Sequence, residues 1–271
     1  MLDLLLVAIF GVAFGSFLNV LIVRIPKGES IIFGSSHCTK CGGKLRFYHN
    51  IPLLSYIFLG GKCSFCKEKI SPRYPIVEAL SGVVALLLVH KLSLSLPAMF
   101  VIASFFMLIT LSFIDLEFQL VPDSINLLAI IFAIFGAWSV GGVMLNFQNA
   151  LIIAGGFTLL RFSLSYILTK SARIEASKHE TSWSKNYHTY GFIEAMGEGD
   201  IMVAATMGAL LGIQLSLVAI FLSALLALPI LLYLQFKHST TRVAFVPFLS
   251  IATLIVYYFD TECVKILGAL L

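Results

Sequence analysis

The chain has 271 residues, of which 59% are hydrophobic and only 12% carry a charge. Its mean hydropathy is +0.98, and its formal net charge at pH 7 is +4. This composition excludes an ordinary soluble domain and predicts an integral membrane protein built from apolar helices. The small net charge matters less than the positions of the basic residues along the chain.

The first apolar run covers residues 4–23 and predicts a membrane helix. It has no basic segment before it and no small-residue cleavage site after it, so we interpret it as a retained helix and not a cleaved signal peptide. The small and polar residues Gly11, Gly15, Ser16 and Asn19 predict a face for close helix packing.

Residues 24–75 form a long polar stretch with nine Lys or Arg residues and two Glu residues. The positive-inside rule therefore predicts that this loop is cytoplasmic and that the N-terminus lies outside. Some of the basic residues are expected to attract anionic lipid head groups. No aromatic-basic strip or known binding motif accompanies them, so no nucleic-acid partner is expected.

Two Cys-x-x-Cys pairs lie inside this loop. Their members are Cys38, Cys41, Cys63 and Cys66. Each pair supplies two thiolates, and glycine pairs at 42–43 and 60–61 supply turns, which predicts a structural zinc ion in a zinc-ribbon-like insertion. Disulfides suit a reducing cytosol poorly, and free or redox-active thiols are the remaining alternative. Cys263 stands alone, and we interpret it as apolar packing.

Further apolar runs predict seven more membrane helices. They cover residues 76–89, 98–114, 125–140, 150–168, 201–212, 215–236 and 245–259. We therefore expect an all-α polytopic membrane protein with about eight transmembrane helices and both termini outside. It divides into a first helix (1–23), a cytoplasmic Cys-rich zinc-binding loop (24–75) and a helical core (76–271).

Three polar features of these later segments have structural explanations. Glu78 lies near the start of its helix, where an acid complements the helix dipole. Arg161 lies inside a span and is expected to reach the interface or to pair with a carboxylate. The second basic loop, residues 169–196, contains Trp183, Tyr187 and Tyr190, which we interpret as an interface belt.

Two acidic clusters stand at the ends of apolar runs. Asp123 can cap the helix that follows it, but Asp115 ends a helix, where the dipole disfavours negative charge. Gly197-x-Gly199-Asp200 opens another run, and its alternative explanation is a helix N-terminus with dipole-complementing acids. In the predicted topology, Asp115 and Asp200 lie at the same cytoplasmic depth.

Two carboxylates at one level can share a proton, so that one activates water while the other protonates the carbonyl oxygen or leaving amine. This is aspartyl proteolysis, and it predicts Asp115 and Asp200 as the catalytic pair. The supporting residues are predicted to be Gly197, Gly199, Glu117 and Asp123. Two alternatives stay open: a proton-coupled transporter with carboxylates nearer the midplane, and a membrane scaffold whose zinc ribbon binds a partner.

Several motifs together resemble the bacterial type IV prepilin peptidases. They are residues 15–20 with Arg24-Ile25-Pro26, the cysteine pairs around residues 50–56, residues 70–78, the Asp115 loop ending in Pro122-Asp123, and Gly197-x-Gly199-Asp200. The resemblance runs from about residue 11 to the region of Pro247. Met202 stands where family members commonly carry Lys, Val246 departs from a Phe-Gly-Pro-Phe-like element, and the loop before Gly197 is long.

The resemblance implies a bifunctional enzyme of the bacterial cytoplasmic membrane. It implies that residues matching Asp115 and Asp200 cut the basic leader from prepilins and pseudopilins at the cytoplasmic face. It further implies methylation of the new N-terminal residue, typically Phe, by S-adenosylmethionine, and it associates the Cys-rich loop with zinc and with this second activity. The sequence contains no glycine fingerprint for a methyl donor, so a peptidase without methyltransferase activity is the alternative.

Overall fold

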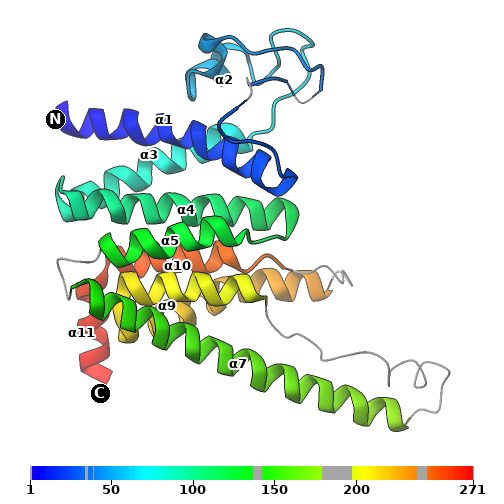
Figure 1. Cartoon of the computed structure of the whole chain (residues 1–271), viewed down its shortest axis with the longest axis vertical. Helices are drawn as coiled ribbons and strands as arrows, with labels where there is room; N and C mark the ends of the chain where they lie inside the picture. Colours follow the sequence, from blue (N-terminus) through cyan, green and yellow to red (C-terminus); the bar gives the residue numbers. More distant parts are fainter. Residues whose placement is uncertain are drawn as a thin grey trace.

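A computed structural model describes residues 2–33, 36–38, 40–136, 142–178, 197–236 and 243–270. The elements are α1 (Leu2–Arg24), η1 (Ile25–Lys27), η2 (Phe47–Asn50), α2 (Leu54–Phe58), α3 (Arg73–Leu92), α4 (Leu96–Phe118), α5 (Asp123–Gly136), α7 (Val143–Lys178), α9 (Glu198–Phe236), α10 (Val246–Tyr258) and α11 (Asp260–Leu270). The described residues form two isolated β-bridges and no longer strand. The long helices pack side by side, with the loop that carries α2 at one end of the row (Figure 1). The all-α prediction is confirmed. Trp183, Tyr187 and Tyr190 lie outside the described residues.

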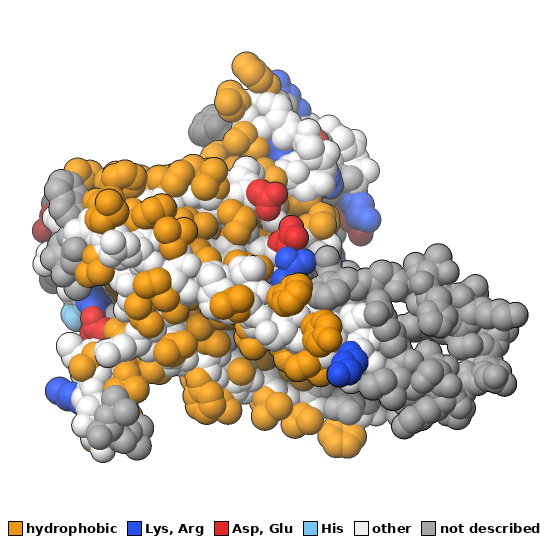
Figure 2. Space-filling model, turned by 60° about the horizontal axis from the view of Figure 1, so that its bottom comes forward, with side chains coloured by type: hydrophobic (Ala, Val, Ile, Leu, Met, Phe, Trp, Pro, Cys, Tyr) orange, Lys and Arg blue, Asp and Glu red, His pale blue; other side chains and the backbone are white. Residues whose placement is uncertain are grey.

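The helices have the lengths and composition that a bilayer requires. Segments of α1, α3, α4, α7 and α9 are each long and apolar enough to cross a membrane, and α5 and α10 are shorter apolar helices. Large apolar side chains stay exposed on the outer helices, such as Leu159 on α7 at 70%. Figure 2 shows apolar side chains spread over the bundle, with charged side chains mostly near its ends. Soluble monomers rarely expose apolar surface on this scale, so the chain is a multi-pass membrane protein.

The helix α9 contains a reversal and is not one straight rod. Gly212 inside it has φ 73° and ψ 178°, a combination that essentially only glycine adopts. Both ends of α9 lie on the same side of the bundle in Figure 1, so the chain turns back within this element. The turn falls at the boundary that the sequence predicts between runs 201–212 and 215–236.

The helix α4 forms the centre of the bundle. Of its most apolar stretch, 72% is buried, and Phe106, Leu108 and Leu111 are almost completely shielded. A helix that is apolar on every side is expected in such a central position. The last turn of α4 therefore belongs to a well-packed helix.

The predicted close-packing face on α1 is confirmed by its contact with α3. A Cβ atom on Gly11 would lie 2.9 Å from the Cα of Gly82, and one on Gly15 would lie 2.7 Å from the Cα of Glu78. Both distances are too short for any residue larger than glycine, as in other small-residue helix pairs. This contact fixes the two helices between which the Cys-rich loop is inserted.

Candidate active site and cysteine cluster

Asp115 lies in the last turn of α4 and is only 7% exposed. Its Oδ2 accepts a hydrogen bond of 3.1 Å from the N–H of Val246 at the start of α10. The first amide groups of a helix lack partners within it and carry partial positive charge. The N-terminus of α10 therefore compensates for the poor position of an acid at the end of α4.

Asp200 lies in the first turn of α9, and the N–H of Gly197 donates a hydrogen bond to its carboxylate. Asp115 is close enough for the two carboxylates to interact electrostatically. Two residues that the sequence predicts as a pair thus come from separate helices to one end of the bundle. Each of them is held by a backbone N–H group.

Gly199 explains how the start of α9 reaches the loop after α4. A Cβ atom at this position would overlap the side chain of Val121, so glycine is required by close approach. The Nδ2 of Asn126 in α5 also donates to the Gly199 carbonyl oxygen at 3.4 Å. Together these contacts connect the Gly-x-Gly-Asp segment to the chain that follows Asp115.

The other acids near this site have separate partners or positions. Glu117 forms an ion pair with Arg73 at the start of α3. Asp123 is the exposed first residue of α5, where a negative charge complements the helix dipole. Arg161 of α7 pairs with Glu198 at 3.1 Å, which confirms the carboxylate partner expected for this arginine.

The four cysteines of the loop come together. Their Sγ atoms all lie within 4.8 Å of one another, and those of Cys38 and Cys66 are 3.9 Å apart. In a tetrahedral site with Zn–S bonds of about 2.3 Å, neighbouring sulfur atoms are about 3.8 Å apart. None of the four is in a disulfide. The donor set and its spacing therefore fit a zinc ion.

Each cysteine pair is shaped by the same local turn. Cys38 donates its N–H to Gly43 O at 2.9 Å and Cys63 donates to Glu68 O at 2.8 Å. The residue after each second cysteine is left-handed, with φ 70° at Gly42 and 60° at Lys67. In the second turn, the N–H groups of Cys66 and Phe65 lower the pKa of the Cys63 thiol to about 7. A lower thiol pKa favours the thiolate that binds metals.

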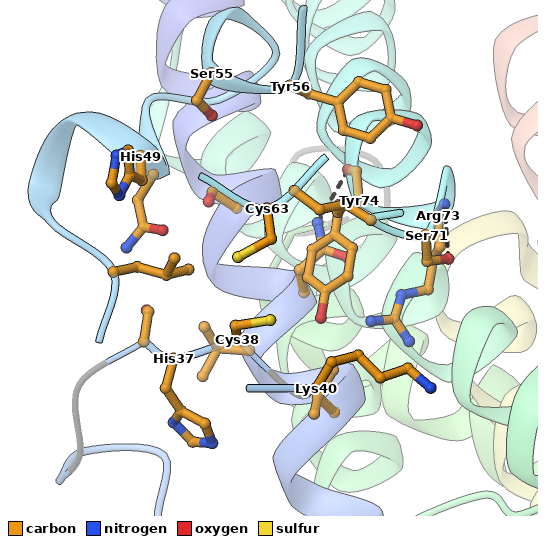
Figure 3. Close-up of a pocket in the computed structure, with 18 of the residues that line it drawn as sticks. His37, Cys38, Lys40, His49, Ser55, Tyr56, Cys63, Ser71, Arg73 and Tyr74 are labelled. Atoms are coloured by element: carbon orange, nitrogen blue, oxygen red, sulfur yellow. Dashed lines mark hydrogen bonds between the residues drawn. The ribbon is translucent and has the colours of Figure 1, made fainter. Parts of the chain in front are cut away.

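A cavity of about 590 Å³ lies between the cysteine cluster and the membrane helices. Its lining extends from Cys38 and Cys63 to Arg73, Tyr74 and Glu117. Figure 3 shows the sulfur atoms of Cys38 and Cys63 near one another, with the Tyr74 ring beside them in this view and the Arg73 side chain farther to the right.

Glu78 also lines this cavity, and its hydrogen bond to the loop was not predicted from the sequence. It is 7% exposed, and its carboxylate accepts the N–H of Leu53 at 2.8 Å. Leu53 has φ 60°, an unfavourable value for a branched side chain, so this bond stabilises a strained turn of the loop. The available signal was an acid inside an apolar run, because burial of a charge in a membrane helix requires a partner.

Known protein families match both the part of the chain that carries the cysteine cluster and the part that carries the two aspartates. Residues 9–92 match the bacterial peptidase A24 N-terminal domain, and residues 102–232 match the type IV leader peptidase family. The first match contains the four clustered cysteines, and the second contains Asp115 and Asp200.

Curated relatives are named prepilin leader peptidase/N-methyltransferase. The one from Pseudomonas putida is 27% identical over 91% of this chain and 87% of its own length. Those from Neisseria gonorrhoeae and Vibrio cholerae are 31% and 33% identical, over 82% and 83% of this chain and 79% and 83% of their own lengths. No solved structure matches significantly. The chain belongs to the type IV leader peptidase family.

Proposed function

We propose that this protein is a membrane aspartyl endopeptidase that removes the leader peptide of type IV prepilins and pseudopilins and then methylates the new N-terminus. The names of the relatives combine a leader peptidase with an N-methyltransferase. The observation that carries the peptidase half is the convergence of Asp115 and Asp200 from α4 and α9. Glu117, Asp123, Gly197 and Gly199 are the proposed supporting residues.

The chemistry follows from two neighbouring carboxylates that share one proton. The ionised carboxylate accepts a proton from water as the water oxygen attacks the peptide carbonyl carbon. The protonated one donates to the carbonyl oxygen, and a proton then passes to the leaving nitrogen as the C–N bond breaks. The N–H groups of Val246 and Gly197 hold the two side chains in fixed orientations for these transfers.

The position of the pair supports a peptidase over a transporter. Asp115 lies in the last turn of its helix and Asp200 in the first turn of its own, whereas transport sites lie near the bilayer midplane. The proposed topology has eight crossings: α1, α3, α4, α5, α7, the two parts of α9, and α10. The basic loop between α1 and α3 would be cytoplasmic, and both aspartates would face the cytoplasm of a bacterial inner membrane.

The proposed division is a first helix (1–23), a Cys-rich loop (24–75) and a peptidase core (76–271). Within the loop, four thiolates would hold a structural zinc ion with no open position, in an arrangement like a zinc ribbon. When bound, S-adenosylmethionine supplies a sulfonium methyl group: the amine lone pair forms the N–C bond, the C–S electron pair stays on sulfur, and the amine releases a proton. The chain must hold this donor near the newly formed peptide end.

The test uses purified protein in liposomes and a prepilin that bears its leader. Product mass is measured for the wild type, Asp115→Asn and Asp200→Asn, with and without S-adenosylmethionine. We expect the wild type to remove the leader and add one methyl group, and both variants to lose nearly all cleavage. Cleavage at the wild-type rate by both variants would overturn the peptidase assignment. Dyad-dependent cleavage without a methyl group would restrict the function to a peptidase.

A further inference from the structure

The middle of the Cys-rich loop is apolar, although basic residues lie on both sides of it in the chain. Residues 51–59 contain only two polar side chains. In α2, the side chains of Leu54, Ile57 and Phe58 are 52%, 70% and 84% exposed. Residues three and four positions apart lie on one face of a helix. These three side chains therefore form a single exposed apolar face, which indicates a surface that contacts a partner or a membrane.

The opposite face of α2 is directed toward α1. Ser55, Tyr56 and Leu59 line the cavity beside the cysteine cluster, and the lining on α1 extends from Ser16 to Arg24. The apolar face of α2 consequently points away from the helical bundle. In Figure 1, α1 lies at the edge of the row of long helices, on the side where α2 stands. At that edge, a membrane helix borders on lipid.

The start of α2 lies at the depth of the membrane helices. The N–H of Leu53, the residue before α2, donates to Glu78 Oε2 of α3 at 2.8 Å. Glu78 packs on Gly15 of α1, where an added Cβ would lie 2.7 Å from the Glu78 Cα. At about 1.5 Å per residue, this contact is about 14 Å from the last residue of α1 and about 8 Å from the first residue of α3. Both positions belong to spans that are apolar enough to cross a hydrocarbon core of about 30 Å.

The figures agree with this depth. Figure 1 shows α2 level with the C-terminal half of α1 and not beyond the end of that helix. Figure 2 shows apolar side chains at the outer tip of the loop, with Lys and Arg side chains beside them. The exposed lysines Lys62, Lys67 and Lys69 follow α2 in the chain. Lysine side chains can reach from an apolar surface to lipid head groups and are attracted by anionic lipids.

The backbone of this segment is also suited to contact with lipid, where polar groups without a partner are costly. Leu53 N–H has its partner in the Glu78 carboxylate, and the Ser55 hydroxyl donates to the carbonyl oxygen of Ile51 at 2.8 Å. Further N–H groups donate to carbonyl oxygens within the segment, namely those of Ser55, Ile57, Leu59, Gly60, Gly61 and Lys62. The turn around α2 thus satisfies most of its own polar groups.

We propose that α2 inserts into the bilayer beside α1, with Leu54, Ile57 and Phe58 in contact with the acyl chains and Lys62 at the head groups. Glu78 holds the start of the inserted segment at its depth. The Cys-rich loop is then attached to the membrane at its apolar middle as well as through α1 and α3. This inference depends on α1 and α3 crossing the membrane, and it is independent of the proposed peptidase chemistry.

The experiment uses the full-length protein with a single tryptophan as a reporter of depth. Trp138 and Trp183 are replaced by Phe, and the reporter is introduced by Phe58→Trp or, as the matched control, by Tyr48→Trp. The Tyr48 hydroxyl accepts a hydrogen bond from Arg46 Nη1 at 3.0 Å, and an arginine favours water over hydrocarbon. Each variant is reconstituted in phosphatidylcholine and phosphatidylglycerol vesicles. Fluorescence is measured with lipids brominated along the acyl chain and, separately, with iodide in the water.

The Phe58→Trp reporter is expected to lose most of its fluorescence with brominated lipid and little with iodide, and to emit at a shorter wavelength than the control. The Tyr48→Trp reporter is expected to respond to iodide and not to brominated lipid. Quenching of the Phe58→Trp reporter by iodide alone would overturn the inference. Quenching by neither agent would also overturn it, because the face would then be covered by protein, such as a second copy of this chain.

Phe58→Asp tests the same contact without a fluorophore. A carboxylate is disfavoured in hydrocarbon, so α2 should leave the bilayer, and protease cleavage within residues 51–62 should become several-fold faster in vesicles. Phe58→Leu is the control and should be cut at the wild-type rate. Because Phe58 is exposed within the protein, neither change removes a core contact, and both variants should unfold in detergent at the wild-type temperature. Equal cleavage of all three proteins in vesicles would contradict the insertion of α2.

Discussion

The two candidate sites of this chain are supported in opposite ways. The aspartate pair stands at the ends of packed helices, where backbone N–H groups and a glycine contact hold it. The cysteine cluster stands in a loop where Cys63 is the one buried residue among the described residues of 25–72. A segment without an apolar core needs another source of stability, and a metal ion is the usual one.

Because the two sites are supported differently, a change that inactivates one of them should leave the other intact. The helices of the bundle are held by close packing, as between α1 and α3, so the aspartate pair should survive changes in the loop. The loop depends on four thiolates and on bonds such as that between Glu78 and Leu53. Perturbations directed at one site therefore provide a direct test of the comparison.

The largest effect is expected from the aspartates themselves. Asp115→Asn and Asp200→Asn should each reduce leader cleavage by on the order of a thousandfold or more, because an amide can neither accept the proton from water nor share one. Methylation of a synthetic peptide that already has a free N-terminal Phe should persist in both variants. Mass spectrometry of the two reactions checks the prediction, and loss of both activities together would contradict separate sites.

Removal of the metal is expected to produce the reverse pattern. Chelation, or Cys63→Ser, should lower bound zinc from about one ion per chain, since four thiolates make one tetrahedral site. Methylation should fall far more than cleavage, and limited proteolysis within residues 25–72 should accelerate. Metal content by mass spectrometry and the positions of the cuts give the readout. A zinc-free loop that resists proteolysis as well as the native protein would refute the stabilising role of the metal.

A smaller effect is expected where α9 touches the loop after α4. Gly199→Ala should cost about 1–3 kcal/mol of stability and reduce cleavage, because its Cβ would overlap Val121. Val121→Ala in the same chain should restore part of both losses. Gly155→Ala on α7 is the matched control, because nothing lies within 4 Å of its added Cβ. Equal losses at both glycines would show that close packing is not the reason for Gly199.

The sequence predicted those features that depend on local pattern. The helical segments, the clustering of Cys38 with Cys66, and the division of α9 near Gly212 all follow from hydropathy, ligand spacing and glycine content. The same reasoning linked Asp115 to Asp200 through topology alone, because alternate crossings return helix ends to one side.

The contacts that surround these residues could not be predicted in this way. Val246 lies 131 positions from Asp115, and nothing in either segment indicates that their ends meet. The sequence predicted Glu117 as a supporting residue from its place two positions after Asp115, but it did not indicate that the carboxylate pairs with Arg73 of another helix. The cavity likewise combines Asn19, Ser64 and Arg73 from three segments, whose proximity depends on tertiary packing.

The smallest effect is expected from Arg161. Its ion pair with Glu198 is two positions from Asp200, yet the Glu198 side chain is 82% exposed. An exposed pair contributes about 1 kcal/mol or less, so Arg161→Gln should change cleavage by about twofold at most and should lower the unfolding temperature only slightly. Arg161→Lys preserves the charge and serves as the control in a leader-cleavage assay at low and high salt. A loss at Arg161→Gln as large as that at Asp200→Asn, rescued by Arg161→Lys, would instead show that cleavage requires the positive charge at position 161. The aspartate site would then depend on a side-chain ion pair, and the contrast with the cysteine loop would no longer hold.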